Sequence, residues 1–262
     1  MPAFGLIIVG DELLSGKRSD KHLPKVIELL GARGLRLAWA EIVGDEPDRI
    51  TALLERTFAS GDIVLSCGGI GATPDDHTRQ CAARALGVPL ALHPEGRTLV
   101  EKRIRETAQA AGVEADLNAP DNLQRLKMAE FPEGAGIIPN PFNGFPGFTV
   151  RDHDFVPGFP VMAHPMIEWV LDTQYAHLAH REPHAERSLL VFGKAESVLT
   201  PLMERLEARY PLARVFSLPS VGDEKTGRHI ELGVKGDPAQ VGEAWEELRH
   251  ALAQMGAETR PL

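Results

Sequence analysis

The segment from Asp62 to Thr78, DIVLSCGGIGATPDDHT, constrains the fold of this chain more than any other. Its residues Ile63 to Leu65 form a continuous apolar run, which is typical of a strand buried on both faces of a parallel sheet. A glycine-rich turn follows, and the apolar spacing of the next residues, TRQCAARALG, predicts a helix. A buried strand, an open turn and a helix in this order indicate a binding site for a phosphate.

The glycines of this turn are predicted to expose backbone amides to a ligand. Gly68, Gly69 and Gly71 leave no side chain in the way and permit positive φ angles at little steric cost. The amides of the first helical turn, which begins near Thr78, would face the same pocket, and the helix dipole favours an anion there.

Two adjacent carboxylates follow the turn, and they suggest a metal. At ~4 Å and an effective dielectric of ~20, each carboxylate would repel a bare phosphate charge by ~4 kcal/mol. A divalent cation reverses the sign, so we predict a hard metal such as Mg²⁺ held by Asp75 and Asp76. In the alternative interpretation Thr73 or Asp75 is only a helix N-cap and Asp76 only a partner of the helix dipole.

Strands and helices alternate along the first half of the sequence. This alternation predicts right-handed crossovers, a mainly parallel sheet and a three-layer α/β sandwich. The expected elements are a strand at 4–9, a helix at 21–32, a strand at 35–43, a helix at 47–58 and a strand at 62–66.

The remaining elements predict two domains. Helices at 94–111, 121–128 and 161–175 and a strand at 154–157 complete a first domain over 1–178. Residues 177–186 are polar and are predicted to be a linker. Strand, helix, strand, strand and helix patterns then indicate a small α+β, ferredoxin-like domain over 187–262.

Composition excludes several classes of protein. Hydrophobic residues make up 43% and charged residues 25% of the 262, as in ordinary globular proteins. The net charge of −9 argues against general nucleic-acid binding. No stretch reaches the ~20 apolar residues that cross a bilayer. The N-terminus lacks the basic leader of a secretory signal, so we expect a cytoplasmic protein with no membrane partner.

Three polar loops leave the carboxyl ends of the predicted parallel strands, where ligands gather in such sheets. They cover residues 10–17, 44–46 and 67–78. If they converge, Gly10, Asp11, Glu12 and Asp45 share one rim with the glycine turn and its aspartates. An acidic rim of this kind suits a metal better than a bare anion.

Four ordered motifs carry a resemblance to a known family: GDELLSG, VGDE, GGIGATPDDHT and PEGAGIIPNPFNGFPGF. Together they resemble the N-terminal domain of competence/damage-inducible protein A, over about residues 4–175. That domain belongs to the molybdopterin-binding, or molybdenum-cofactor biosynthesis, superfamily. The small domain after it is similar to the second domain of the same family.

The resemblance implies a MogA-like α/β sandwich, frequently a homo-oligomer, whose pocket binds a pterin or a nucleotide pyrophosphate. Relatives adenylylate molybdopterin, insert molybdate, or hydrolyse ADP-ribose with a divalent metal. Two aspartates essential in the adenylylating relatives match Asp45 and Asp76. Many members carry a further amidohydrolase domain, and this chain ends before one, so we do not expect that activity.

Three residues depart from the family pattern, as does a Gly-Pro-Pro turn that reads Gly158-Phe159-Pro160 here. His22 occupies the place of an asparagine, and Arg125 and Met128 replace two amide side chains. They bear on which substrate is bound. Among the basic residues near the loops, such as Arg18, the sequence favours Arg79 as the partner of a polyanionic ligand, because it lies one turn into the helix after the carboxylates.

The leading hypothesis is metal-dependent hydrolysis of a nucleotide pyrophosphate such as ADP-ribose, with Mg²⁺, Mn²⁺ or Co²⁺. Asp76 with Asp75 would hold the metal, and Asp45 would position or deprotonate the attacking water. The ligand contacts are assigned to Gly10, Asp11, Glu12, Gly68, Gly69, Gly71, Thr73 and Thr78. The alternatives are a molybdopterin-binding or molybdopterin adenylyltransferase-like protein, and a non-catalytic oligomeric partner.

Overall fold

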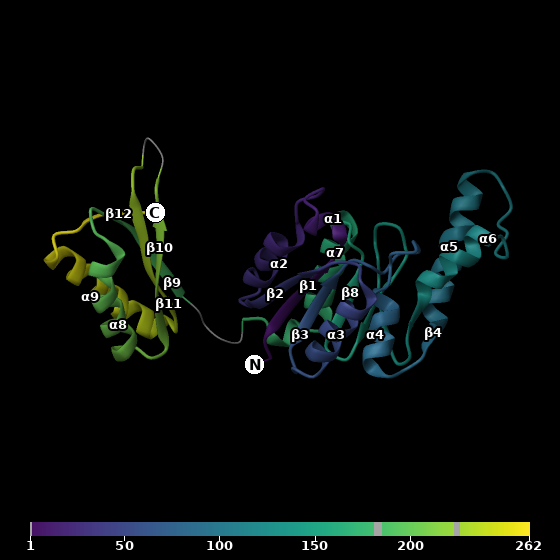
Figure 1. The fold of residues 1–262 in the computed structure, drawn as a ribbon, viewed down its shortest axis with the longest axis horizontal. Helices are drawn as coiled ribbons and strands as arrows, with labels where there is room; N and C mark the ends of the chain where they lie inside the picture. The colour runs from purple at the N-terminus through teal and green to yellow at the C-terminus, as the bar shows by residue number, and fades with distance from the viewer. Residues whose placement is uncertain (1, 181–184, 223–225) are drawn as a thin grey trace. The chain divides into compact units, whose positions relative to one another are not determined.

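The computed structural model describes residues 2–180, 185–222 and 226–262. They form two compact units, Met1–Ala179 and His180–Leu262, which are drawn in Figure 1. The predicted domains, 1–178 and 187–262, lie within these two units. Of the predicted linker, residues 181–184 lie outside the described residues, and strand β9 already begins at Ala185.

The first unit is built on a six-stranded sheet with the order β2-β1-β3-β8-β7-β6. The first four strands of this order pair in parallel, and β7 pairs antiparallel with both of its neighbours, β8 and β6. Their bounds are β1 Phe4–Val9, β2 Leu37–Val43, β3 Ile63–Cys67, β6 Gly136–Ile138, β7 Gly147–Val150 and β8 His153–Val156. The mainly parallel sheet predicted from the sequence is therefore confirmed.

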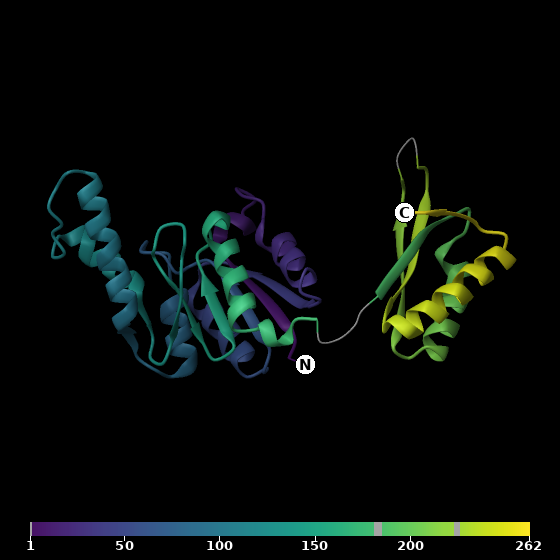
Figure 2. The same cartoon turned by 180° about the vertical axis from the view of Figure 1, so that it is seen from behind.

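Helices cover both faces of this sheet. Helices α3 (Pro47–Phe58) and α4 (Thr78–Leu86) lie over the face turned toward the viewer in Figure 1, and α7 (Pro160–Thr173) over the face seen in Figure 2. Helix α2 (His22–Gly31) packs beside α7. This confirms the three-layer α/β sandwich.

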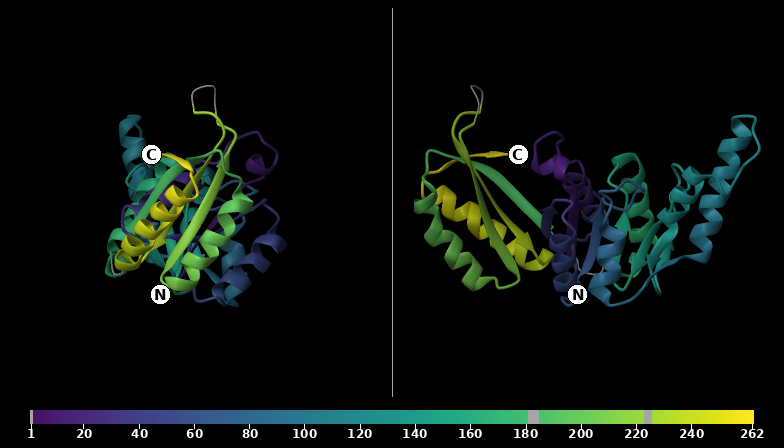
Figure 3. Two further views of the ribbon diagram at one scale, coloured as in Figure 1. Left: turned by 90° about the vertical axis from the view of Figure 1, so that its left-hand side faces the viewer. Right: turned by 45° about the vertical axis from the view of Figure 1, so that its right-hand side comes forward.

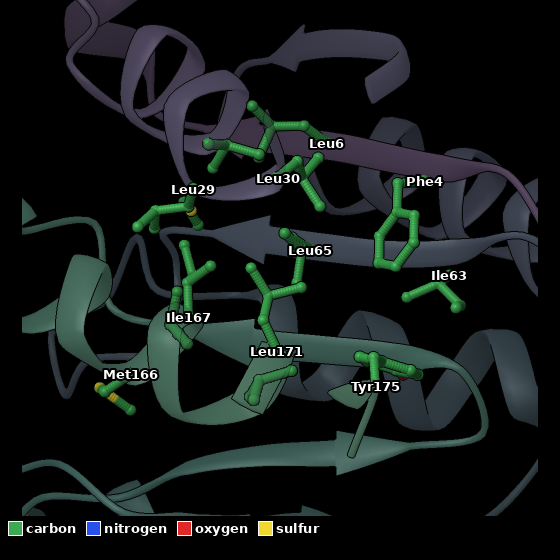
Figure 4. Packing of buried hydrophobic residues seen from close by; sticks show 14 of the residues in the cluster. Phe4, Leu6, Leu29, Leu30, Ile63, Leu65, Met166, Ile167, Leu171 and Tyr175 are labelled. Atoms are coloured by element: carbon green, nitrogen blue, oxygen red, sulfur yellow. The ribbon is translucent and has the colours of Figure 1, made fainter. Parts of the chain in front are cut away.

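Alternate residues of the same strands feed the two hydrophobic cores. On the α2–α7 side, Leu6 and Leu65 pack with Leu30 and Ile167, as Figure 4 shows. On the α3–α4 side, the intervening strand residues pack against the two helices. The strand residues are Ile7, Val9 and Val64, and the helix residues are Ile50, Leu54 and Cys81. Burial of both faces explains why these strands read as unbroken apolar runs.

A smaller segment extends from the sandwich between β3 and β6. Figure 3 shows its long helix α5 (Pro94–Ala110) running away from the sheet. Its other elements are β4 Leu90–Leu92, α6 Pro120–Leu126, the 3-10 turn η1 Lys127–Ala129 and β5 Glu130–Pro132, which pairs with β4. The sequence predicted one helix over 121–128, but the α-helix ends at Leu126 and the chain tightens into the 3-10 turn.

The second unit is a four-stranded antiparallel sheet with two helices. Its elements are β9 Ala185–Phe192, α8 Glu196–Arg209, β10 Ala213–Ser220, β11 His229–Gly236, α9 Pro238–Gln254 and β12 Glu258–Pro261. The sheet order β10-β11-β9-β12 and the βαββαβ sequence are those of ferredoxin-like domains. The sequence did not predict β12, because ETRP is a polar, exposed edge strand without an apolar pattern.

Candidate functional site

A cavity of about 440 Å³, here called the glycine cavity, opens at the carboxyl ends of β1, β3 and β8. Residues of all three predicted loops line it, including Gly10 and Glu12 after β1, Asp45 after β2 and the turn from Gly68 to Thr73 after β3. Asp75 and Asp76 lie on its wall as well. The loops therefore meet at one edge of the sheet, as expected for parallel strands.

Two of the loops hold each other through a pair of reciprocal hydrogen bonds. The Asp11 amide donates to Asp45 Oδ2 at 3.0 Å, and the Asp45 amide donates to Asp11 Oδ1 at 3.2 Å. A Cβ at Gly44 would lie 2.3 Å from Asp11 Oδ1, so the bond requires glycine there. Asp11 itself lines a shallow acidic hollow beside the glycine cavity, together with Glu12, Lys17, Asp45 and Asp75.

Asp45 is a carboxylate of the site whose pKa is raised. Partial burial raises the pKa of Asp45, and the negative charges of Asp11, Glu12 and Asp75 raise it further against the lowering effect of the Asp11 amide. A carboxylate with a raised pKa accepts a proton more readily near neutral pH.

The glycine turn is shaped by contacts within the protein. Gly68 and Gly69 have φ angles of 109° and 69°. A Cβ on Gly68 would lie 2.2 Å from the Val9 carbonyl oxygen, and one on Gly69 would lie 2.1 Å from Thr78 Oγ1. The protein's own packing therefore requires both glycines, whatever ligand is bound.

Thr78 stabilises the backbone of this turn. It is fully buried, and its hydroxyl donates to the Gly68 carbonyl at 3.1 Å. It is absent from the residues that line the glycine cavity. Of the ligand contacts assigned from the sequence, Thr78 is thus placed behind the turn, whereas Thr73 and Gly71 border the cavity.

Asp76 also has a role inside the turn. Its Oδ2 accepts hydrogen bonds from the Thr73 amide, at 2.8 Å, and from the Thr73 hydroxyl. These bonds close a turn before α4 and do not cap the helix, whose N-cap is His77 without a side-chain cap bond, so neither Thr73 nor Asp75 is the N-cap. Asp76 also borders the cavity. Within residues 2–180, 185–222 and 226–262, no group of three or more His, Cys, Asp or Glu side chains is placed to hold a metal ion.

Arg79 does not face a ligand, contrary to the sequence-based preference. It is 3% exposed, and its guanidinium donates to the Gly71 carbonyl at 2.6 Å and to the Lys127 carbonyl. Gln124 donates to the neighbouring Ala72 carbonyl at 2.9 Å. Both side chains therefore fix the glycine turn to the segment that contains α6 and η1.

The three departures from the family pattern occupy three different environments. Met128 lines the glycine cavity. His22 is buried, with its Nε2 3.0 Å from the Gly158 carbonyl oxygen, and lines a neighbouring cavity of about 450 Å³. Arg125 bonds to Asn122 and pairs with Asp121 on its own helix, and it borders neither of these cavities.

The glycine cavity has a second wall, whose residues were not assigned as ligand contacts from the sequence. It comes from the Gly- and Pro-rich segment before β7 and from the start of α7, and it consists of Asn140, Asn143, Phe145, Pro146, Phe159 and Met162. Asn140 donates to Asn143 Oδ1 at 2.8 Å, which fixes the turn. The asparagines between prolines and glycines were the available signal, since such residues build specific turns.

No helix in the described parts of the chain has the length and apolar character needed to cross a membrane.

Comparison with known proteins agrees with the family resemblance. Residues 5–177 match the family described as probable molybdopterin binding domain. A CinA-like protein of Anaeromyxobacter sp. (strain Fw109-5) is 33% identical over 93% of this chain and 62% of its own length. One from Anaeromyxobacter dehalogenans (strain 2CP-1) is 36% identical over 76% of this chain and 48% of its own length. The chain thus spans about half to three fifths of these relatives.

A solved structure shares the fold of the first unit. The CinA protein of Thermoplasma acidophilum, described as having unknown function, is 25% identical, covers 65% of this chain and 97% of its own, and superimposes with a TM-score of 0.55. Since the family match covers most of the chain and includes every loop of the glycine cavity, the chain belongs to the probable molybdopterin binding domain family.

Proposed function

We propose that the first unit binds a phosphorylated pterin of the molybdopterin type in the glycine cavity. The observation that carries this proposal is the open turn from Gly68 to Thr73, which borders a cavity of about 440 Å³ within a molybdopterin-binding family. That volume lies in the range of roughly 300–1,000 Å³ usual for small-molecule sites. This reading replaces nucleotide hydrolysis, the leading sequence hypothesis, as the main function.

The two walls of the cavity suit the two parts of such a ligand. Met128, Phe145 and Met162 supply apolar surface for a ring, and the backbone of the glycine turn supplies polar groups for a phosphate. Asn143 lines the same cavity, with its amide nitrogen 3.2 Å from Met162 Sδ.

The test is the pterin content of the purified protein. The full chain, produced in a host that makes molybdopterin, is expected to release a fluorescent oxidised pterin on denaturation, and protein from a molybdopterin-deficient host is expected to release none. Thr73→Trp should fill the cavity and abolish the signal. Thr98→Trp, on an exposed face of α5 remote from the glycine turn in sequence, is the matched control. Equal pterin content in both variants would contradict the proposal.

Metal-dependent hydrolysis of a nucleotide pyrophosphate is a second candidate, favoured by the Asp45 and Asp75 carboxylates on the cavity wall. Mg²⁺ commonly takes only one or two protein carboxylates and completes its shell with water and substrate phosphates. Asp75 and Asp76 on the cavity wall fit that mode, which leaves Asp45 free to act as the base. Asp45, with its raised pKa, would accept a proton from the attacking water, and a bound metal would supply charge stabilisation.

This candidate is tested with ADP-ribose and Mg²⁺, Mn²⁺ or Co²⁺, measuring release of AMP. Asp45→Asn should remove the activity, and Asp48→Asn, which changes an exposed carboxylate paired with Arg84, should not. No AMP with any of the metals would rule out the hydrolase. Transfer of AMP from ATP to a bound pterin would instead identify an adenylyltransferase, and neither ligand nor activity would leave a non-catalytic partner.

We also propose that the chain forms a homo-oligomer, as its family resemblance implies. Large apolar side chains are exposed on adjoining elements of the first unit: Leu14 is 62%, Ile27 52% and Ile42 44% exposed. Light scattering coupled to gel filtration tests this, and a monomeric mass would contradict it.

A further inference from the structure

The glycine cavity has an unusual charge distribution for a site that takes a phosphorylated ligand. Four carboxylates line it: Glu12, Asp45, Asp75 and Asp76. Among the described residues that line it, Arg18 is the one Lys or Arg side chain. The basic residue that the sequence favoured, Arg79, is buried in bonds to backbone carbonyls.

The opposite charges lie toward different neighbours of the cavity. Asp45 and Asp75 also border the shallow acidic hollow that contains Asp11. Arg18 instead borders the second cavity, of about 450 Å³, that contains His22. Glu12 is a carboxylate that borders all three spaces. The glycine cavity thus has an acidic end at Asp45 and Asp75 and a cationic end at Arg18.

Arg18 is held at its end without an ion pair. Its guanidinium carbon lies 5.9 Å from the centre of the Phe159 ring, and the described residues offer it no carboxylate partner. Its backbone amide donates to the Glu12 carbonyl at 3.0 Å, which fixes the loop that carries it. A guanidinium seated on an aromatic face keeps the N–H groups at its edge available, and their fork matches two phosphate oxygens.

We propose that Arg18 is the anion-binding residue of the glycine cavity and that it sets the direction of the ligand. The phosphate lies at the Arg18–Phe159 end, and a metal ion or hydrogen-bond donors of the ligand lie at the Asp45–Asp75 end. The proposal rests on the proposed function, since it assumes that a phosphorylated small molecule occupies this cavity. Phe159 is 54% exposed and is therefore accessible to both Arg18 and a ligand.

The test compares phosphorylated probes with their unphosphorylated counterparts by calorimetry on the full chain. The pairs are 6-hydroxymethylpterin phosphate with 6-hydroxymethylpterin, and AMP with adenosine. Arg18→Gln should weaken binding of a phosphorylated probe by about 10-fold to 100-fold, the range for a lost charge-assisted hydrogen bond, and leave its counterpart unchanged. Arg18→Lys should restore part of the loss, because a point charge lacks the bidentate fork.

Lys17→Gln is the matched control. Lys17 precedes Arg18 in the same loop and borders the acidic hollow but not the glycine cavity. An equal loss in both variants would show a general charge effect and overturn the inference. If Arg18→Gln keeps the wild-type preference for the phosphorylated probe, the role of Arg18 is overturned and the proposed function is not. No preference for phosphate in the wild-type protein would overturn the proposed function as well.

Discussion

The glycine turn, residues 68–78, and the entrance loop, residues 10–22, border the same cavity but differ in whether an arginine of each is bonded to the protein. In the turn, the side chains that suggest ligand binding are engaged with the protein: Thr78 bonds to Gly68, Asp76 to Thr73, and Arg79 to Gly71. In the entrance loop, Arg18 is exposed and unpaired among the described residues. Residues in the turn should therefore affect stability first, and those in the entrance loop binding first.

The largest expected effect on stability comes from replacing a glycine that has a positive φ angle. Each region has such a glycine, Gly68 in the turn and Gly16 in the entrance loop. Gly68→Ala should lower the free energy of unfolding by about 3 kcal/mol or more, because the new Cβ meets the Val9 carbonyl oxygen and the backbone is left-handed. Gly16→Ala should cost only about 1 kcal/mol, since nothing lies within 4 Å of its Cβ position. Urea unfolding measures both, and equal losses would remove the distinction between the regions.

A buried carboxyl outside both regions supplies the pH dependence of stability. Burial raises the pKa of Asp154 to about 7, against hydrogen bonds from Thr149 and Tyr175 that lower it. Because the folded pKa is raised, this contribution is present below the unfolded value near pH 4 and is lost as pH rises through about 7.

The contribution of Asp154 to stability should therefore fall by up to a few kcal/mol between pH 4 and 8. The opposite trend comes from His153, because burial lowers its pKa to about 4 and its contribution grows as pH rises from 4 to 6.5. Asp154→Asn should remove this contribution, so the variant should lose less stability than the wild-type protein as pH rises. The slope that remains reports the other groups with shifted pKa values, among them His153 and Asp45. Thermal melts across this pH range provide the measurement. An unchanged slope in the variant would show that another group dominates.

The two threonines of the turn are expected to differ less strongly in their effect on the free energy of unfolding. Thr78→Val keeps the shape but leaves the Gly68 carbonyl without its hydroxyl partner, which should cost about 1–2 kcal/mol. Thr73→Val, at an exposed position, should cost roughly 0.5 kcal/mol. The reverse order in urea unfolding would mean that the turn is held mainly from the solvent side.

The smallest effect on stability is expected in the entrance loop. Arg18→Gln should change the free energy of unfolding by less than about 0.5 kcal/mol, because the side chain is exposed and has no ion pair among the described residues. Differential scanning calorimetry checks this. A substantial loss of stability would show that Arg18 has a structural role, as Arg79 has in the glycine turn.

Local sequence patterns were enough to predict the first sheet and its site. The run Phe4–Val9 and the helix from Pro47 to Phe58 were predicted with their observed bounds. A buried strand must be apolar on both faces, and proline is favoured at a helix start, so each signal is contained in a few neighbouring residues. The meeting of Asp11 with Asp45 was expected from the parallel direction of the strands, since the carboxyl ends of parallel strands share an edge.

The sequence by itself thus determined the layers, the order of the loops and the position of the cavity. Only the tertiary structure decided which side chains are free to meet a ligand. Arg79 bonds to Lys127, 48 positions away, and Arg18 reaches Phe159 on a different loop. A side chain's partner depends on distances between segments far apart in the chain, and local periodicity carries no information about those distances. For that reason the side chains of the glycine turn are bonded largely within the protein, and the cation that we propose for the ligand, Arg18, lies in the entrance loop.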